Sequence, residues 1–200
     1  MSVEVGLVSL CSLVCLVGVP YTVLMPVFAA EILGGGAHTL GFLMTATGAG
    51  ALLGALWLAS RRTITGLGRN IATAGAIFSI GLMAFAFSHV LWLSATLLVV
   101  TGFGFIVMVA SSNTLLQTIV EDAKRGRVIS FFLMAYFGTT PFGGLVAGAI
   151  SARIGAPYTL AIGGALCLVG VGWFSSRLTM LHQDIQPIFV RLGVKPAGSG

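Results

Sequence analysis

Charged side chains are scarce in this chain of 200 residues, because ten Lys and Arg and five Asp and Glu make up only 8% of it. Soluble domains carry about 25% charged residues, since a surface in water needs them. The chain is also 57% hydrophobic and has 28 glycines. Intrinsic disorder, which requires low hydrophobicity and high charge, is therefore excluded. The composition indicates an integral membrane protein.

A basic face is lacking as well. The formal net charge is only +5, and most of the basic residues stand between long apolar runs. A protein that follows a phosphate backbone needs Lys and Arg clustered on one face. We therefore expect the lipid bilayer, and no nucleic acid, as a partner.

The uncharged runs are long enough to count membrane-spanning helices, each of which needs about 20 apolar residues. They are continuously apolar, whereas membrane β-strands alternate in polarity over about ten residues. The Ser88–His89 pair divides the longest run into two spans. We predict an all-α domain over residues 1–176 and a cytoplasmic tail over 177–200. The six expected transmembrane helices cover about 5–30, 39–60, 70–88, 90–118, 128–152 and 155–176.

The basic residues predict the orientation. With six spans, nine of the ten fall on the side of both termini, and Arg153 alone falls on the other. Lys and Arg collect in cytoplasmic loops, so both termini are expected to be cytoplasmic.

Catalytic and metal-binding motifs are missing from the chain. It has no paired carboxylates, no phosphate-binding loop and no Ser-His-Asp set. Cys11 and Cys15 stand four residues apart, but they lack the further ligands of a metal site. We expect ordinary buried thiols, no enzyme activity, no metal and no cofactor.

No Asp, Glu, Lys or Arg lies at mid-depth in any expected span, although buried charges usually mark function in membrane helices. The polar residues at depth are uncharged. Asn113 and Gln117 share one helix face, because they are four residues apart, and they either line a cavity or bond to a neighbouring helix. The candidates for a substrate cavity, or for packing alone, are Tyr21, Met25, Asn113, Gln117, Tyr136 and Phe137.

Glycine and proline predict close packing and bending. Gly50 and Gly54 have the small-residue spacing that brings membrane helices together. Such faces either fix the helices or let them slide. Proline within a span allows a kink, which is either static or a moving hinge. The hinge candidates are Pro20, Pro141, Gly143 and Gly144.

The six-helix layout, residues 113–117 running into residues 125–128, and the tail segment 187–193 resemble the major facilitator superfamily. Within it they are similar to the branch of the enterobactin exporter. The resemblance covers nearly the whole chain and matches the C-terminal half of a twelve-helix transporter. It implies one half of that fold, a 3+3 inverted repeat, in a bacterial-type plasma (inner) membrane.

The resemblance also implies residue roles. Residues 54–69 look like a degraded form of the superfamily's cytoplasmic loop motif, whose Asp is absent here. Residues 138–144 are similar to the antiporter motif of the fifth helix, displaced to its counterpart in the other half. Ion pairs between loop charges would open and close an inner gate. The gate and loop candidates are Arg61, Arg62, Arg69, Asp122, Arg125 and Arg127.

Transport by alternating access is the function that the resemblance implies, with efflux of a small amphipathic substrate such as a siderophore or drug. Proton coupling would need acidic residues, which these spans lack and the other half would supply. A six-helix half cannot enclose a site alone. The chain is then a piece of a larger transporter, pairs with another six-helix subunit, or homodimerises. The alternatives are a membrane scaffold that binds a partner without transport, and a truncated gene remnant.

Overall fold

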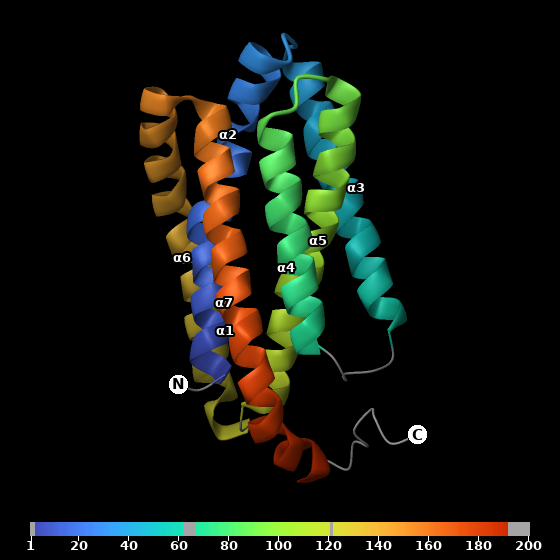
Figure 1. Ribbon diagram of the computed structural model, residues 1–200, viewed down its shortest axis with the longest axis vertical. Coiled ribbons are helices and arrows are strands. Elements are labelled where there is room, and N and C mark those ends of the chain that lie inside the picture. The colour runs from blue at the N-terminus through green and yellow to red at the C-terminus, as the bar shows by residue number, and fades with distance from the viewer. Residues whose placement is uncertain (1–2, 62–66, 121, 192–200) are drawn as a thin grey trace.

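The computed structural model describes residues 3–61, 67–120 and 122–191, and in these ranges the chain is helical without strands. Helices α3 (Ala37–Ser60), α4 (Leu67–Ala86), α5 (Leu91–Ile119), α6 (Asp122–Ile154) and α7 (Ala156–Arg191) run up and down the bundle (Figure 1). They follow a first helical column made of α1 (Val3–Leu13), η1 (Val14–Gly18), α2 (Tyr21–Val27) and η2 (Phe28–Ile32). The start of α1 and the end of α7 lie at the same end of the bundle.

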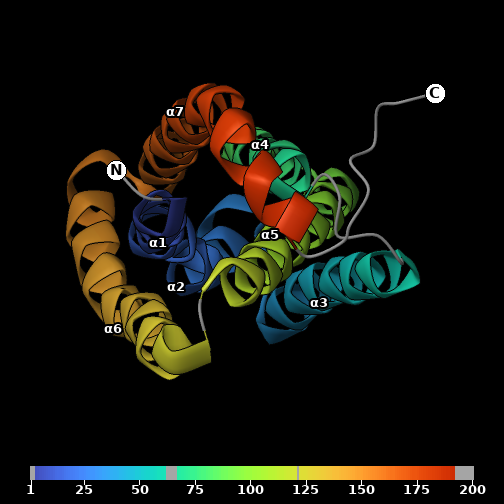
Figure 2. The same ribbon diagram turned by 90° about the horizontal axis from the view of Figure 1, so that it is seen from below.

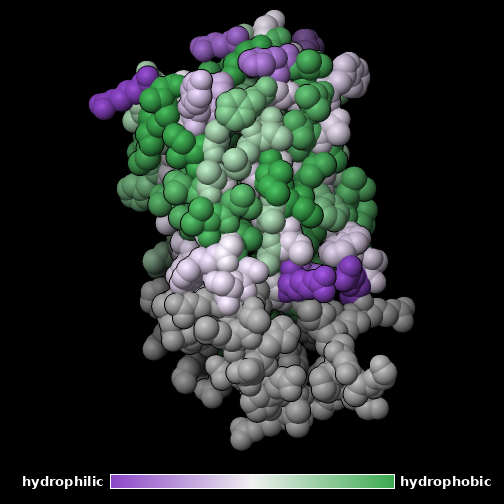
Figure 3. All heavy atoms as spheres, in the orientation of Figure 1, coloured by the Kyte–Doolittle hydropathy of each residue, from purple (hydrophilic) through white to green (hydrophobic). Residues whose placement is uncertain are grey.

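Five segments of the described chain are long and apolar enough to cross a membrane: Ser9–Ile32, Ala37–Ser60, Leu67–Ala86, Leu91–Thr118 and Ala156–Ser176. The remaining helix, α6, has 33 residues. At 1.5 Å per residue its length also exceeds the thickness of the bilayer core. The surface of the bundle carries a hydrophobic band, with hydrophilic residues above it and again at its lower edge (Figure 3). The predicted all-α membrane fold with six helices is confirmed.

The helix ends follow local sequence signals. The break expected at Ser88–His89 is confirmed, because α4 ends at Ala86 and α5 begins at Leu91. Gly34 has φ 63° in the turn before α3, a conformation that suits glycine. His38 lies in the first turn of α3. The helix α7 continues through residue 176 to Arg191, so the last span and the first part of the tail form one helix.

The first column is irregular where its prolines stand. Two π-helical segments flank α2, which begins directly after Pro20 and contains Pro26. Proline has no N–H for the helix ladder and its ring clashes with the carbonyl four residues earlier. The π-helical turns lie beside these prolines, and π-helical turns within α-helices are frequent at functional sites.

In chain order the helices form two sets of three: the first column, α3 and α4, and then α5, α6 and α7. The main contacts run between the two sets. Helices α3 and α4 pack on α5, whereas α6 and α7 pack on the first column, and α4 packs along α7 (Figure 2). The first column and α5 run in opposite directions (Figure 1). This exchange of partners is the pattern expected of a 3+3 inverted repeat.

Aromatic rings hold the centre of the bundle. Phe28 stacks on Phe85 with ring centroids 4.8 Å apart. The Phe78 ring of α4 packs against the rings of Tyr21 and Phe105, with centroid distances of 6.4 Å and 5.5 Å. The core therefore lies where the first column, α4 and α5 meet.

Candidate functional site

The C-terminal end of α5 carries polar side chains that the bundle covers only in part. Asn113 is half-buried and Gln117 is exposed, and both belong to the apolar segment Leu91–Thr118, which is long enough to cross a membrane. The hydroxyls of Thr114 and Thr118 donate to the carbonyls of Ala110 and Thr114 at 2.9 Å and 2.8 Å. We call Asn113 and Gln117 the α5 amide face.

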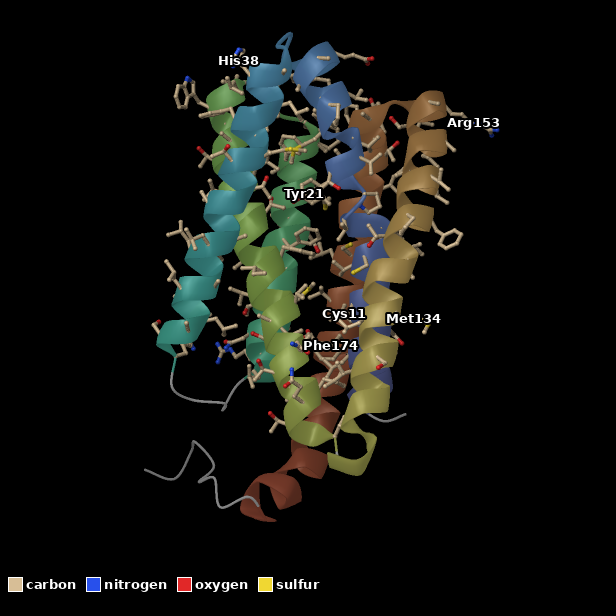
Figure 4. The ribbon with its side chains drawn as sticks, turned by 180° about the vertical axis from the view of Figure 1, so that it is seen from behind. Cys11, Tyr21, His38, Met134, Arg153 and Phe174 are labelled. Carbon is tan, nitrogen blue, oxygen red and sulfur yellow. The ribbon has the colours of Figure 1, made fainter. Side chains whose placement is uncertain are left out.

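The aromatic and sulfur candidates of the first column lie elsewhere. Tyr21 and Met25 are 5% and 1% exposed, and the Tyr21 ring points into the bundle toward α4 (Figure 4). In this conformation they are core residues, and the structure does not bring them to the α5 amide face. Tyr136 and Phe137 belong to α6, but they lie outside the residues whose side chains the structure describes.

Two hinge candidates from different helices meet at one contact. A Cβ atom on Gly143 of α6 would collide with the carbonyl oxygen of Leu16 and lie 2.9 Å from the Pro20 ring. Only glycine allows the backbone of α6 this close to η1. Gly144 faces Val23. We call Leu16, Pro20 and Gly143 the hinge contact.

A second glycine contact to η1 comes from α7. Gly163 of α7 approaches the Val17 carbonyl, where an added Cβ would be 2.6 Å from the oxygen. Two helices, α6 and α7, therefore contact the backbone of the π-helical turn through glycines. The exposed Pro141 stands two residues before Gly143 in an unbroken α6.

Two of the six gate candidates, Arg61 and Arg69, have described side chains, and both are exposed. Arg61 follows the end of α3, where its guanidinium lies 4.0 Å from the centroid of the Trp57 ring. Arg69 lies in the first turn of α4. Arg62 lies outside the described residues, and so do the side chains of the three candidates on α6: Asp122, Arg125 and Arg127. The expected gate ion pairs stay a prediction.

The sequence did not indicate how the cysteines and two serines would meet. Cys11, Cys15 and Cys167 are free and buried, and Cys15 is close enough to the other two thiols to interact with them electrostatically. Ser112 of α5 lies beside Cys11, although the two do not reach hydrogen-bond geometry. No three His, Cys, Asp or Glu among the described residues could hold a metal ion.

Part of the cysteine arrangement could be predicted from the sequence. The four-residue spacing of the first two cysteines places them on one face, but nothing local indicates that α7 brings a third thiol to it. Contact between residues so far apart in sequence depends on the order in which the helices pack.

Comparison with known proteins identifies one family. The profile of a family described as transmembrane secretion effector, of the major facilitator type, matches residues 1–188. No curated protein matches the chain significantly.

Proposed function

Because this chain belongs to the transmembrane secretion effector family of major facilitator transporters, we propose that it forms one half of an exporter. A transporter is what the family and the apolar helices support. The proposal adds a direction, a substrate class and a mechanism: export of a small amphipathic molecule by alternating access, with the site between this half and a second six-helix half.

The α5 amide face carries the proposal. A primary amide has two donor hydrogens and two acceptor lone pairs, more than a single contact satisfies, so hydrocarbon is an unfavourable environment for its exposed part. Asn113 is only half-buried and Gln117 is exposed within a membrane-crossing segment. Their neighbours outside this bundle are therefore water, substrate or another helix, which is what a central cavity between two halves supplies.

The hinge contact fits the same mechanism. Alternating access needs helices that bend or rock at defined points. The first column has its π-helical turn and Pro20 where α6 and α7 touch it through glycines. We propose that the parts of the first column above and below η1 change their angle at this place.

Membrane orientation and location complete the proposal. We place the termini in the cytoplasm of a bacterial-type cell, because Arg61 directly follows α3 and Arg69 lies in the first turn of α4. The end of α3 and the start of α4 lie at the same end of the bundle as the start of α1 (Figure 1), and Lys and Arg collect on the cytoplasmic side. Proton coupling, where it operates, falls to acidic residues of the second half.

The test begins with the mass of the purified chain in mild detergent, measured by light scattering with the detergent subtracted. A dimer supplies both halves, and vesicles containing it are expected to export amphipathic fluorescent dyes. If the chain is a monomer, we propose that the second half lies outside it. Dye export is then expected only when that half is present. Dye export by a monomeric chain would contradict the proposal.

Asn113→Leu decides the role of the α5 amide face. We expect it to abolish export while the protein keeps its unfolding temperature. Thr114→Val is the matched control, because the Thr114 hydroxyl is already bonded within its own helix. Equal export by the wild type and Asn113→Leu would remove the α5 amide face from the transport path.

A further inference from the structure

Ser111 and Ser112 on α5 carry two hydroxyls that no described group satisfies. Both side chains are 0% exposed, and neither oxygen has a hydrogen-bond partner. Fully buried polar atoms without partners are rare in native structures, because each has lost its hydrogen bonds to water without gaining others. A partner that is not part of this chain would restore those hydrogen bonds.

Other buried hydroxyls in these helices behave differently. Ser79 of α4 is also 0% exposed, and its hydroxyl donates to the carbonyl of Gly75 at 2.8 Å. Thr101, on the same helix as the two serines, donates to the carbonyl of Leu97 at 2.7 Å. Back-bonding of this kind is the usual solution for Ser and Thr in membrane helices. Ser111 and Ser112 do not use it.

The surroundings of Ser112 are weakly polar. Its hydroxyl lies beside the thiol of Cys11 on α1, which is 2% exposed and sits in the lower half of the bundle (Figure 4). A thiol is a weak donor and a weak acceptor, so it does not replace a full hydrogen bond. The contact lies between the first column and α5, where the two sets of three helices meet.

Further polar side chains stand on α5 beyond Ser112. Asn113 is half-buried, and Gln117, one turn nearer the C-terminal end of α5, is exposed. No described group of three His, Cys, Asp or Glu is arranged for a metal ion. Water, which typically makes two to four hydrogen bonds when buried, fits this chemistry.

We infer that water binds at Ser111 and Ser112, and that at Ser112 it hydrates the contact between α1 and α5 inside this half. Bound water satisfies both hydroxyls. It also lets α1 and α5 shift against each other without leaving a buried group unpaired, because a water molecule can exchange its partners. The inference does not depend on the proposed export function.

The test uses the Cys11 thiol as a reporter. In the full chain carrying Cys15→Ala and Cys167→Ala, Cys11 is the only thiol, and its infrared S–H band can be followed after transfer of lipid-reconstituted protein into D2O. We expect the S–H band to convert to S–D while the slowest backbone amides remain unexchanged. Ser112→Ala should slow or abolish the conversion, and Ser79→Ala, the satisfied buried serine, should leave it unchanged.

Two outcomes overturn the inference. A Cys11 thiol that exchanges only as fast as the slowest amides shows that the contact is dry, and this measurement needs no serine variant. A conversion that Ser112→Ala and Ser79→Ala affect equally shows that water does not reach the thiol by way of Ser112.

Discussion

The Cα atom of Gly143 packs against the backbone carbonyl of Leu16, with the ring of Pro20 beside it. In a regular α-helix the Leu16 carbonyl would accept from the N–H of residue 20, which proline lacks. The close approach of α6 therefore coincides with a place where the first column lacks a regular α-helical hydrogen bond. Two sequence features more than 120 residues apart form one hinge contact.

Gly143→Ala is expected to destabilise the protein. The added Cβ would collide with the Leu16 carbonyl, and overpacking of this kind costs about 1–3 kcal/mol. Gly148→Ala on the same helix has nothing within 4 Å of its Cβ, and it should raise stability slightly through helix propensity. Thermal unfolding in detergent compares the two variants. Equal unfolding temperatures for the two variants would contradict the close packing of α6 on η1.

Gly50→Ala tests the packing of α3 on α5. The Gly50 Cα faces the Val99 backbone, whereas Gly48, two residues away, has open space around it. We expect Gly50→Ala to lower the free energy of unfolding by about 1–3 kcal/mol. Gly48→Ala should leave it unchanged or raise it. Denaturant titration followed by circular dichroism measures both, and a loss of stability in Gly48→Ala alone would refute the packing.

The stacked pair Phe28 and Phe85 should couple energetically. Both rings are fully buried with centroids 4.8 Å apart, and such aromatic pairs contribute about 0.5–1.5 kcal/mol beyond their burial. A double-mutant cycle with Phe28→Leu and Phe85→Leu measures this coupling from unfolding free energies. The cycle on Phe42 and Trp92, whose rings are exposed, should give a smaller value. Additive effects of the two core changes would rule out a specific ring interaction.

The orientation can be tested with two new cysteines. In a chain without its three native cysteines, His38→Cys and Ser60→Cys place thiols at exposed positions at opposite ends of α3. We expect an impermeant maleimide to label His38→Cys on intact cells. It should label Ser60→Cys only after the membrane is opened. The reverse pattern would put the termini outside the cell.

The candidate site was only partly predictable from the sequence. The shared face of Asn113 and Gln117 follows from helix geometry, and the structure leaves these residues partly uncovered on α5. Tyr21 and Met25 were proposed for the same cavity, but the structure buries both in the core. The reason is that a single span shows which residues share a face and does not show which neighbour covers that face.

Composition and run length alone determined that this is an all-α membrane protein, because hydrocarbon requires every backbone polar group to be bonded within its own helix. The end between α4 and α5 followed from the local break at Ser88–His89, whereas α7 continues past the expected end of the last span to Arg191. Only the tertiary structure decided which glycines touch a carbonyl, why Gly50 is packed and Gly48 is free, and how Cys11, Ser112 and Cys167 come together. These contacts join residues far apart in sequence, and in lipid they depend on close backbone packing, for which a small residue is necessary but not sufficient.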